Sequence, residues 1–427
     1  MSDDQDADDE ESFNDYELSA LVTSFIGDAK TTRGFSWSAA LKYKNMVVEY
    51  APAGTDFETA KKQVHAEYEH YNNRFHYKAD VTNLKPGTEY VYRIGDVTYN
   101  KWSDKYNFKT EDENVKEFSF LGIADTQSAS WDEGFYLLKD VMDTALEETP
   151  DMKFMVHLGD MVENGWNESQ WKNYFDAIKG YSETLPHMAI IGNHELQKDA
   201  TTAGKYYSLY FNNPDNGRNA LGSFTSEGLT SPYIIGAVDN FGESAYSFDY
   251  GDVHFAVINS GMETSSPDQP LFVAQQREWL RNDLENSNAK WKIVMLHIGL
   301  YLARDYRLNN KQLEDIIDEC EVDLVLQGHD HYVFRTYPIR NGEIVTKENP
   351  STIKKGTGTV YTILGSAGPK RYDDTSTNSP YCAFFYKSEK LLPTYTTFKV
   401  SENKIEAVTK QIDGVVIDTF TIVDSKE

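Results

Sequence analysis

The chain has 427 residues, of which 40% are hydrophobic and 13% aromatic, so it can form a large core and is not a wholly disordered protein. This length exceeds that of a typical single domain, so we expect two domains or more. The net charge of −27 disfavours non-specific binding to nucleic acid, and the sequence contains no apolar run of about 18 residues that would predict a transmembrane helix.

The N-terminal segment, MSDDQDADDEES, is strongly acidic. We expect residues 1–14 to form a solvated, disordered tail. The segment lacks the basic and apolar regions of a signal peptide, although a chain from which a signal or lipoprotein sequence had been removed would look the same. The two cysteines, Cys320 and Cys382, lie far apart in the sequence and outside any CxxC motif. They therefore predict neither a disulfide framework nor a thiolate metal site.

Residues 15–112 have the pattern of an all-β domain. Short segments rich in Val, Tyr and Phe alternate with clusters of Pro, Gly, Asn and Asp, and the clearest predicted strands are Asn45–Tyr50, Phe75–Val81 and Glu89–Ile94. Several short strands at this spacing indicate a β-sandwich. The stretch Leu84–Gly95 resembles the L-x-P-x-T-x-Y-x-Y-R-V-G stretch of fibronectin type III domains, and Trp37 resembles their core tryptophan.

The second predicted domain, residues 113–427, has a different rhythm, which begins after an acidic linker at Thr110–Val115. Short apolar runs alternate with helix-length amphipathic segments, which predicts an α/β domain. The predicted strands are Phe118–Ile123, Lys153–Leu158, Met188–Ile191, Lys292–Leu296 and Val322–Leu326. The predicted helices are Trp131–Glu148, Glu168–Gly180, Phe272–Glu285 and Lys311–Cys320, and strands follow again after residue 340.

Each of these five apolar runs is followed by residues that can bind a metal ion. In chain order they are Asp125, Asp160, Asn193 with His194, His297, and His329 with His331. Ligands of open α/β sheets bind beyond the carboxyl ends of the strands, so these side chains could meet in one pocket. A single Gly-Asp turn or a lone histidine usually has only a structural role. The complete ordered series is much less probable by chance, and it indicates a binding site.

The residue types in the series suit a pair of metal ions. Carboxylate and imidazole ligands favour Fe, Zn or Mn over metals that prefer soft ligands. Two such ions, roughly 3.5–4 Å apart, could ionise a bridging water near neutral pH and hold the oxygens of a phosphoryl group during in-line attack. The bound metal would also supply the positive charge that an acidic protein needs in order to attract an anionic substrate.

The series resembles the five motifs of calcineurin-like metallophosphoesterases, and its flanks resemble the purple acid phosphatases and their bacterial relatives. The flanking stretches are Tyr246–Phe255 (YSFDYGDVHF), Gly328–Pro338 (GHDHYVFRTYP) and Thr357–Gly368 (TGTVYTILGSAG). The similarity spans about residues 116–400, and the preceding sandwich fits the N-terminal domain of the purple enzymes. The resemblance implies a four-layer α/β domain, in which two mixed sheets are flanked by helices.

The resemblance also implies roles for individual residues. Asp160 would bridge the two ions, Asp125 and His331 would complete one site, and the other site would be completed by Asn193, His297 and His329. His194 would contact the phosphate and protonate the leaving oxygen, a role that suits an imidazole with a pKa of about 6.5. Glu195 is expected to orient His194, or only to begin a helix, and His254 is expected to orient a metal ligand.

Three positions depart from the family pattern. The purple enzymes carry a metal-binding tyrosine where this chain has Glu163, so we expect no charge-transfer colour and no obligatory ferric ion. Glu163 could itself bind metal or only line the pocket. Many members of the wider superfamily have histidine where this chain has Gln127, whose oxygen could bind metal or only line the pocket. Extra histidines of the plant enzymes are missing, so substrate contacts could come from Tyr301, Arg304 or Arg307.

The expected function is therefore hydrolysis of small phosphoesters, most simply phosphomonoesters, by an acid phosphatase-like metalloenzyme. A phosphodiesterase or nucleotidase of the same superfamily is the first alternative, because loops rather than metal motifs set the substrate. The second is a cell-surface binding protein with a degenerate catalytic domain. The family's habit of secretion implies an extracellular or cell-envelope location, and a loop at Thr201–Asn240 is expected to shape the pocket.

Overall fold

The computed structural model describes residues 17–196, 204–217, 243–263, 270–303, 311–372, 377–388 and 392–425. The predicted tail at residues 1–14 lies outside these ranges, as do Arg304, Arg307 and most of the expected pocket loop. None of the helices in these ranges is long and apolar enough to cross a bilayer.

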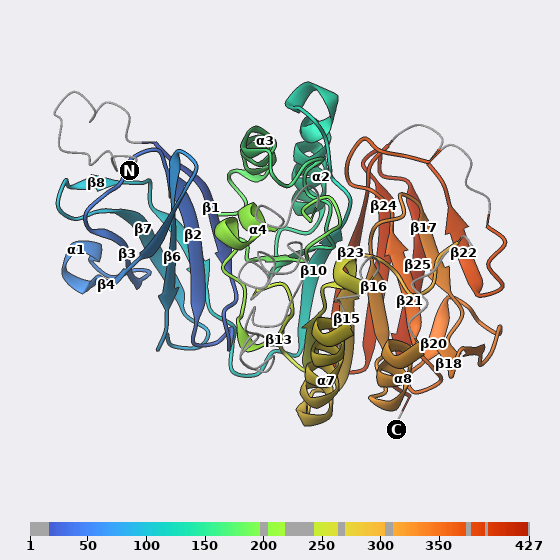
Figure 1. Ribbon diagram of the computed structural model, residues 1–427. Helices are drawn as coiled ribbons and strands as arrows, with labels where there is room; N and C mark the ends of the chain where they lie inside the picture. Colours follow the sequence, from blue (N-terminus) through green and yellow to red (C-terminus); the bar gives the residue numbers. More distant parts are fainter. Residues whose placement is uncertain are drawn as a thin grey trace.

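The N-terminal part is a β-sandwich, drawn in blue in Figure 1. One sheet has the order β1-β2-β6-β5, with bounds Leu18–Ser24, Arg33–Ala39, Arg74–Val81 and Glu67–Tyr71. The other has the order β4-β3-β7-β8, with bounds Lys62–His65, Met46–Pro52, Glu89–Asp96 and Lys101–Trp102, and β9 (Tyr106–Lys109) pairs with β7. A short helix, α1 (Phe57–Ala60), precedes β4. Trp37 is 1% exposed in the core between the sheets, as its sequence context predicts.

Two mixed sheets form the centre of the second part of the chain. The first has the order β12-β11-β10-β23-β24-β25-β20, with bounds His187–Ala189, Met155–His157, Glu117–Ile123, Thr394–Ser401, Lys404–Gln411, Val416–Val423 and Thr352–Lys354. The second has the order β13-β14-β15-β16-β21-β17-β22, with bounds Tyr246–Tyr250, Val253–Val257, Trp291–Leu296, Leu324–Gln327, Val360–Leu364, Val333–Thr336 and Cys382–Tyr386. A small hairpin joins β18 (Ile339–Arg340) to β19 (Glu343–Ile344).

Helices cover the outer faces of these sheets. The helical segments are η2 (Trp131–Phe135), α2 (Tyr136–Glu148), α3 (Glu168–Ile178), α4 (Lys205–Tyr210), η3 (Ser260–Glu263), α7 (Pro270–Asn286) and α8 (Lys311–Glu319). Residues of α2 and α3 share a core with outward residues of β10, and residues of α7 and α8 share another with those of β15. In Figure 1, α2 and α3 lie near the top of the view, and α7 and α8 lie near the bottom. The four-layer fold expected from the resemblance is confirmed.

The alternation of side chains along the strands produces this layering. In β10, Phe118 and Phe120 face the core between the two sheets, whereas Leu121 and Ile123 face the helices α2 and α3. Successive side chains of a strand point to opposite faces, so strands that are covered on both faces consist almost wholly of apolar residues. For this reason the sequence runs that precede the ligand-type residues could be recognised as strands.

The sandwich is joined to the second part of the chain by hydrogen bonds at β1 and β7. The Thr23 N–H donates to the Ser182 carbonyl at 2.9 Å, and the Ser182 hydroxyl donates to the Leu21 carbonyl at 2.8 Å. The Tyr92 hydroxyl, which is fully buried, donates to the Glu183 carbonyl at 2.6 Å. The two parts therefore share buried polar contacts and are not merely linked by the chain.

Candidate metal centre

The ligand-type residues lie at one rim, where the carboxyl ends of strands from both sheets meet. β10, β11 and β12 are parallel to one another in the first sheet, and β14, β15 and β16 are parallel in the second. The segment after β15 is joined to the segment after β11, because His297 Nδ1 lies 2.7 Å from the Leu158 carbonyl oxygen. Side chains that are far apart in the sequence therefore meet at this rim.

Two glycines allow the loops to approach one another closely. Gly159 has a φ of +91°, and a Cβ atom there would lie 2.6 Å from His297 Nδ1. A Cβ atom on Gly192 would lie 2.2 Å from both the backbone nitrogen and Oδ1 of Asp160. Real Cβ atoms do not come this close to other atoms, so only glycine permits this packing of the loops.

Three of the ligand-type residues have an unfavourable backbone conformation. Asp125, Asp160 and His329 have φ values of 56°, 54° and 70°, in the left-handed region that side chains other than glycine seldom occupy. Such conformations cost on the order of 1–3 kcal/mol each and cluster at functional sites. The surrounding structure therefore imposes these side-chain positions at an energetic cost.

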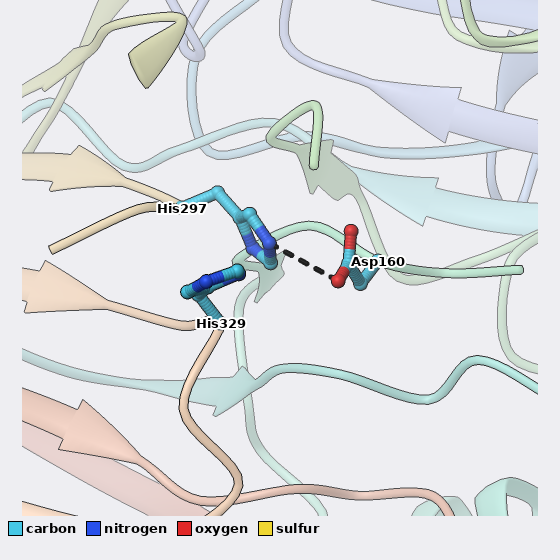
Figure 2. Close-up of side chains that lie close together, drawn as sticks. All are labelled: Asp160, His297 and His329. Carbon is cyan, nitrogen blue, oxygen red and sulfur yellow. Dashed lines mark ion pairs between the residues drawn. The ribbon is translucent and has the colours of Figure 1, made fainter. Parts of the chain in front are cut away.

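Four side chains form the tightest group at the rim: Asp160, Asn193, His297 and His329. Figure 2 shows that the rings of His297 and His329 and the Asp160 carboxylate point toward one another. Asn193 Oδ1 lies 3.0 Å from His297 Nε2 and 2.8 Å from His329 Nδ1. Asp160 Oδ2 lies 3.2 Å from His297 Nε2. One ion could be held by these four side chains together.

Asp125, Gln127 and His331 form a second group beside the first. His331 Nε2 lies 3.6 Å from Asp125 Oδ1. The amide nitrogen of Gln127 lies 3.3 Å from both His331 Nε2 and Asp160 Oδ2. Because Asp160 contacts both groups, its carboxylate is placed where it could bridge two ions.

The electrostatics of the two groups suit cation binding. Burial opposes ionisation of Asp160, but the charge and hydrogen bond of His297 outweigh it and hold the pKa of Asp160 well below its usual value. Burial disfavours the charged form of His297, yet Asp160 and Asp125 raise the pKa of His297 to about 9. A metal ion would compete with a proton for His297, because imidazole binds metal in its neutral form.

A further observation indicates that these residues fit a pair of metal ions. Within the described part of the chain, Asp125 Oδ2, Gln127 Oε1 and His331 Nδ1 are buried and have no hydrogen-bond partner. Buried polar atoms without a partner are rare in folded proteins. Bound cations would satisfy the acceptor oxygens, and the mixed oxygen and nitrogen donors suit Fe, Zn or Mn.

His194 lies at the edge of the group and is partly exposed. Its Nδ1 is 2.7 Å from the Glu163 carbonyl oxygen, and its Nε2 is 3.8 Å from Asp160 Oδ2. The backbone of Glu163 therefore fixes the ring and leaves Nε2 turned toward the centre.

Glu195 has a different role from the one the sequence suggested. Its buried carboxylate accepts hydrogen bonds from backbone N–H groups of the two ligand-bearing loops and not from the His194 ring; the donors are Asp160 at 2.9 Å, Met161 at 2.9 Å, Val162 at 3.2 Å and Gly192 at 2.8 Å. Burial, followed by the charge of Asp160, raises the pKa of Glu195 to about 7. Glu195 thus ties the Asp160 loop to the Asn193 loop.

Two other sequence expectations differ from the structure. His254 orients no ligand of the centre, because its two ring nitrogens lie 2.7 Å from Asp249 Oδ1 and 2.8 Å from Asp283 Oδ2. The ring of Tyr301 is 1% exposed and packs between Tyr361 and Tyr381. It therefore lies in the core rather than on the pocket wall, contrary to its expected role in substrate contact.

The sequence reasoning missed Lys370 and Tyr372. The ring of Tyr372 stacks on His331 with 4.6 Å between ring centroids, and the Lys370 ammonium forms an ion pair with Glu163. Both residues follow directly after the quoted stretch that ends at Gly368. The sequence signal that could have placed these two residues near the site was their position just after a recognised motif.

Two family models and a solved structure are similar to this chain. The family model described as "Calcineurin-like phosphoesterase" matches residues 118–333, and the model described as "Purple acid Phosphatase, N-terminal domain" matches residues 19–110. The fold is similar to the structure of a purple acid phosphatase from yellow lupin (Lupinus luteus) seeds, with a TM-score of 0.78 and 17% identity over 96% of this chain and 75% of that one.

Curated relatives include proteins named as active and as inactive phosphatases. The chain is 23% identical to "Probable inactive purple acid phosphatase 24" of Arabidopsis thaliana, over 69% of this chain and 49% of that protein. It is 24% identical to "Acid phosphatase type 7" of Danio rerio, over 92% of this chain and 88% of that protein. The chain spans about half of the length of the first of these relatives.

Proposed function

Because this chain belongs to the calcineurin-like phosphoesterase family, we propose that it hydrolyses small phosphate esters, and phosphomonoesters in particular, at a centre that holds two metal ions. The observation that supports this proposal most directly is the convergence of ligand-type side chains around Asp160. Asn193, His297 and His329 form one group with it, and Asp125 and His331 belong to the group beside it, which Gln127 joins to Asp160.

We propose the same ligand sets as the family resemblance implies. Asp160 would be shared by the two ions, Asn193, His297 and His329 would hold one, and Asp125 and His331 would hold the other. Gln127 is a further candidate ligand of the second ion, because its amide lies against His331 and Asp160. Two ions of Fe, Zn or Mn, when bound, supply the activation of a water molecule and the positive charge that stabilises a phosphoryl group.

The residues of the chain account for the remaining steps. His194 presents Nε2 to the centre because its Nδ1 is held by the Glu163 carbonyl. We propose that this Nε2 contacts the phosphoryl group and protonates the leaving oxygen as water attacks phosphorus in line. Glu195 keeps the loops of Asp160 and Asn193 together, so the ligand geometry is fixed before substrate binds.

The test combines metal analysis with a substrate panel. The purified chain, loaded with Fe, Zn or Mn in turn, should hold two equivalents of metal and should turn over p-nitrophenyl phosphate faster than bis(p-nitrophenyl) phosphate. The reverse preference would favour the phosphodiesterase alternative. A chain that holds far less than two equivalents and cleaves neither ester would instead be a binding protein with a degenerate site, as the names of some relatives indicate for those proteins.

From the family resemblance we also propose that the protein acts outside the cytoplasm. We further propose that its substrates are small molecules. Fractionation of the producing cells tests the first statement, and finding the protein in the cytoplasmic fraction would contradict it.

A further inference from the structure

Lys370 lies beside the candidate metal centre because it pairs with Glu163. Glu163 is in turn next to His194, whose Nδ1 is 2.7 Å from the carbonyl oxygen and 3.9 Å from Oε1 of Glu163. The other ring nitrogen of His194 is 3.8 Å from Asp160 Oδ2. A single carboxylate thus separates the Lys370 ammonium from the histidine that we place at the phosphoryl group.

The segment that carries Lys370 is fixed to loops of the centre on both sides. Before it, the Ser366 hydroxyl donates to the Asp125 carbonyl at 2.7 Å. After it, the ring of Tyr372 stacks on the ring of His331 at an interplanar angle of 10°. The backbone at Lys370 therefore cannot move away from the centre without breaking contacts to two proposed ligands.

Arg371 holds the turn itself in place. Its guanidinium donates to the carbonyl groups of Gly368 at 2.9 Å and Leu392 at 2.6 Å. Arg371 is thus occupied by the backbone, whereas the neighbouring Lys370 directs its charge to Glu163 at the edge of the centre.

The side chains of Lys370 and Glu163 are 36% and 29% exposed, so a solute can reach the pair, although Glu163 Oε2 itself is buried. Two carboxylates of the centre, Asp125 and Asp160, are almost completely buried close by, and the whole chain carries a net charge of −27. Even with metal bound at these carboxylates, a phosphate ester that approaches this surface meets repulsion from the net charge of the chain. An accessible ammonium at the rim would offset part of that repulsion for an anion.

We propose that Lys370 is a substrate-binding residue whose ammonium exchanges Glu163 for a non-bridging oxygen of the substrate phosphate. Glu163 holds the side chain toward the centre until the anion arrives. This inference rests on the proposed function and deepens it. A phosphomonoester carries up to two negative charges and a diester only one, so the ammonium favours monoesters.

The test measures binding of inorganic phosphate to the metal-loaded protein by calorimetry, together with steady-state kinetics on p-nitrophenyl phosphate. Lys370→Met should weaken phosphate binding and raise KM by about tenfold or more, the effect expected for loss of one charged hydrogen bond, with an unchanged metal content. Lys370→Arg should retain most of the affinity. The matched control is Lys399→Met, which removes an exposed lysine paired with Glu117 at the opposite end of β10 and should change neither quantity.

A second substitution tests the exchange of partners. Glu163→Gln removes the competing carboxylate, so phosphate should bind several-fold more tightly, by roughly the strength of a partly exposed ion pair. In the Lys370→Met background the same substitution should have a smaller effect, because no ammonium remains to be released.

Two results with Lys370→Met overturn the proposal: phosphate binding equal to that of the wild type, or loss of metal, which would reveal a purely structural role. Absence of phosphate binding by the metal-loaded wild type also overturns it. The proposed hydrolysis fails on different grounds, namely a metal-loaded wild type that cleaves no ester of the panel, and the phosphate titration still tests Lys370 in that case.

Discussion

The two ends of the second sheet each carry a histidine that is paired with carboxylates. At the carboxyl end, His297 has Nδ1 on the Leu158 carbonyl and Nε2 near both Asp160 and Asn193. At the other end, His254 has one carboxylate on each ring nitrogen, from Asp249 and from Asp283.

These two histidines have similar electrostatics and different geometry. In both cases burial opposes the charge, nearby carboxylates outweigh burial, and the pKa rises to about 9. A perturbed pKa alone therefore does not distinguish a metal site from a structural ion pair. The distinguishing feature is convergence, because only His297 directs a ring nitrogen at a group that contains further ligand atoms. Four substitutions test this distinction, in order of decreasing expected effect.

Asp160→Asn should have the largest effect, because it removes the charge that both proposed ion sites share. We expect loss of metal and a fall in turnover of more than ~100-fold, since even residues that only orient metal ligands cost 10–100-fold when mutated. Elemental analysis and kinetics on p-nitrophenyl phosphate measure both quantities. The matched control is Asp283→Asn, which removes one of the two carboxylates that pair with His254 and should leave the metal content intact. Full activity in Asp160→Asn would refute the bridging assignment.

Glu195→Gln should destabilise the protein, because it weakens the contact between the Asp160 loop and the Asn193 loop. The amide group of glutamine would face two backbone N–H donors that now bind a carboxylate oxygen. We expect a loss of about 2–3 kcal/mol in the free energy of unfolding, because a buried donor without an acceptor costs about 1–3 kcal/mol. Urea unfolding at pH 8, where the Glu195 carboxyl is ionised, measures the change. An unchanged midpoint would show that these hydrogen bonds contribute little.

Gln127→Ala tests the second group of ligand-type residues, which contains Asp125, Gln127 and His331. If the amide oxygen of Gln127 binds the second ion, its removal should raise the dissociation constant of that ion by about tenfold while the first ion is retained. Competition with a chelator, followed by elemental analysis, separates the two equivalents. Simultaneous loss of both ions, or of neither, would contradict a ligand role for Gln127. Gln127→His should strengthen binding of the second ion, because imidazole is a good ligand for Fe, Zn and Mn.

His254→Gln should have the smallest effect and a distinct pH dependence. The pKa of His254 is about 9 in the folded protein and about 6.5 when unfolded. The stabilisation from its charge is therefore complete below pH 6.5 and is lost as the pH rises from there to 9. Urea unfolding at pH 6 and pH 9.5 should show a difference between wild type and variant that shrinks at the higher pH. A difference that grows with pH would contradict the assignment, and the metal content should not change.

The sequence predicts most of the fold and most of the proposed ligand set, because strands and the ligand-type residues that follow them form local patterns in the sequence. The apolar run before Asp125 corresponds to β10, and the run before His297 corresponds to β15. The run before Asn193 is also a strand, although β12 ends earlier, at Ala189. These strands could be identified because each is covered on both faces and therefore consists almost wholly of apolar residues.

The contacts that sequence reasoning missed depend on which distant segments meet. Whether Glu195 binds the His194 ring or the backbone of another loop depends on the packing of Gly192 against Asp160. The burial of Tyr301 depends on two tyrosines that follow it by 60 residues or more. No local pattern encodes such contacts, so the resemblance gave these residues roles that the tertiary structure does not support.

The buried bonds between the sandwich and the second part of the chain have a consequence for how the protein unfolds. Separating the two parts would leave the Tyr92 hydroxyl and the carbonyl of Glu183 without their partners, and it would also break the paired contacts of Ser182 with β1. Each buried polar group that loses its partner without gaining water adds to the cost of a half-open state. The protein should therefore melt as a single cooperative unit in calorimetry, and the sandwich should behave as part of the scaffold beneath the Asp160 loop rather than as a detachable module.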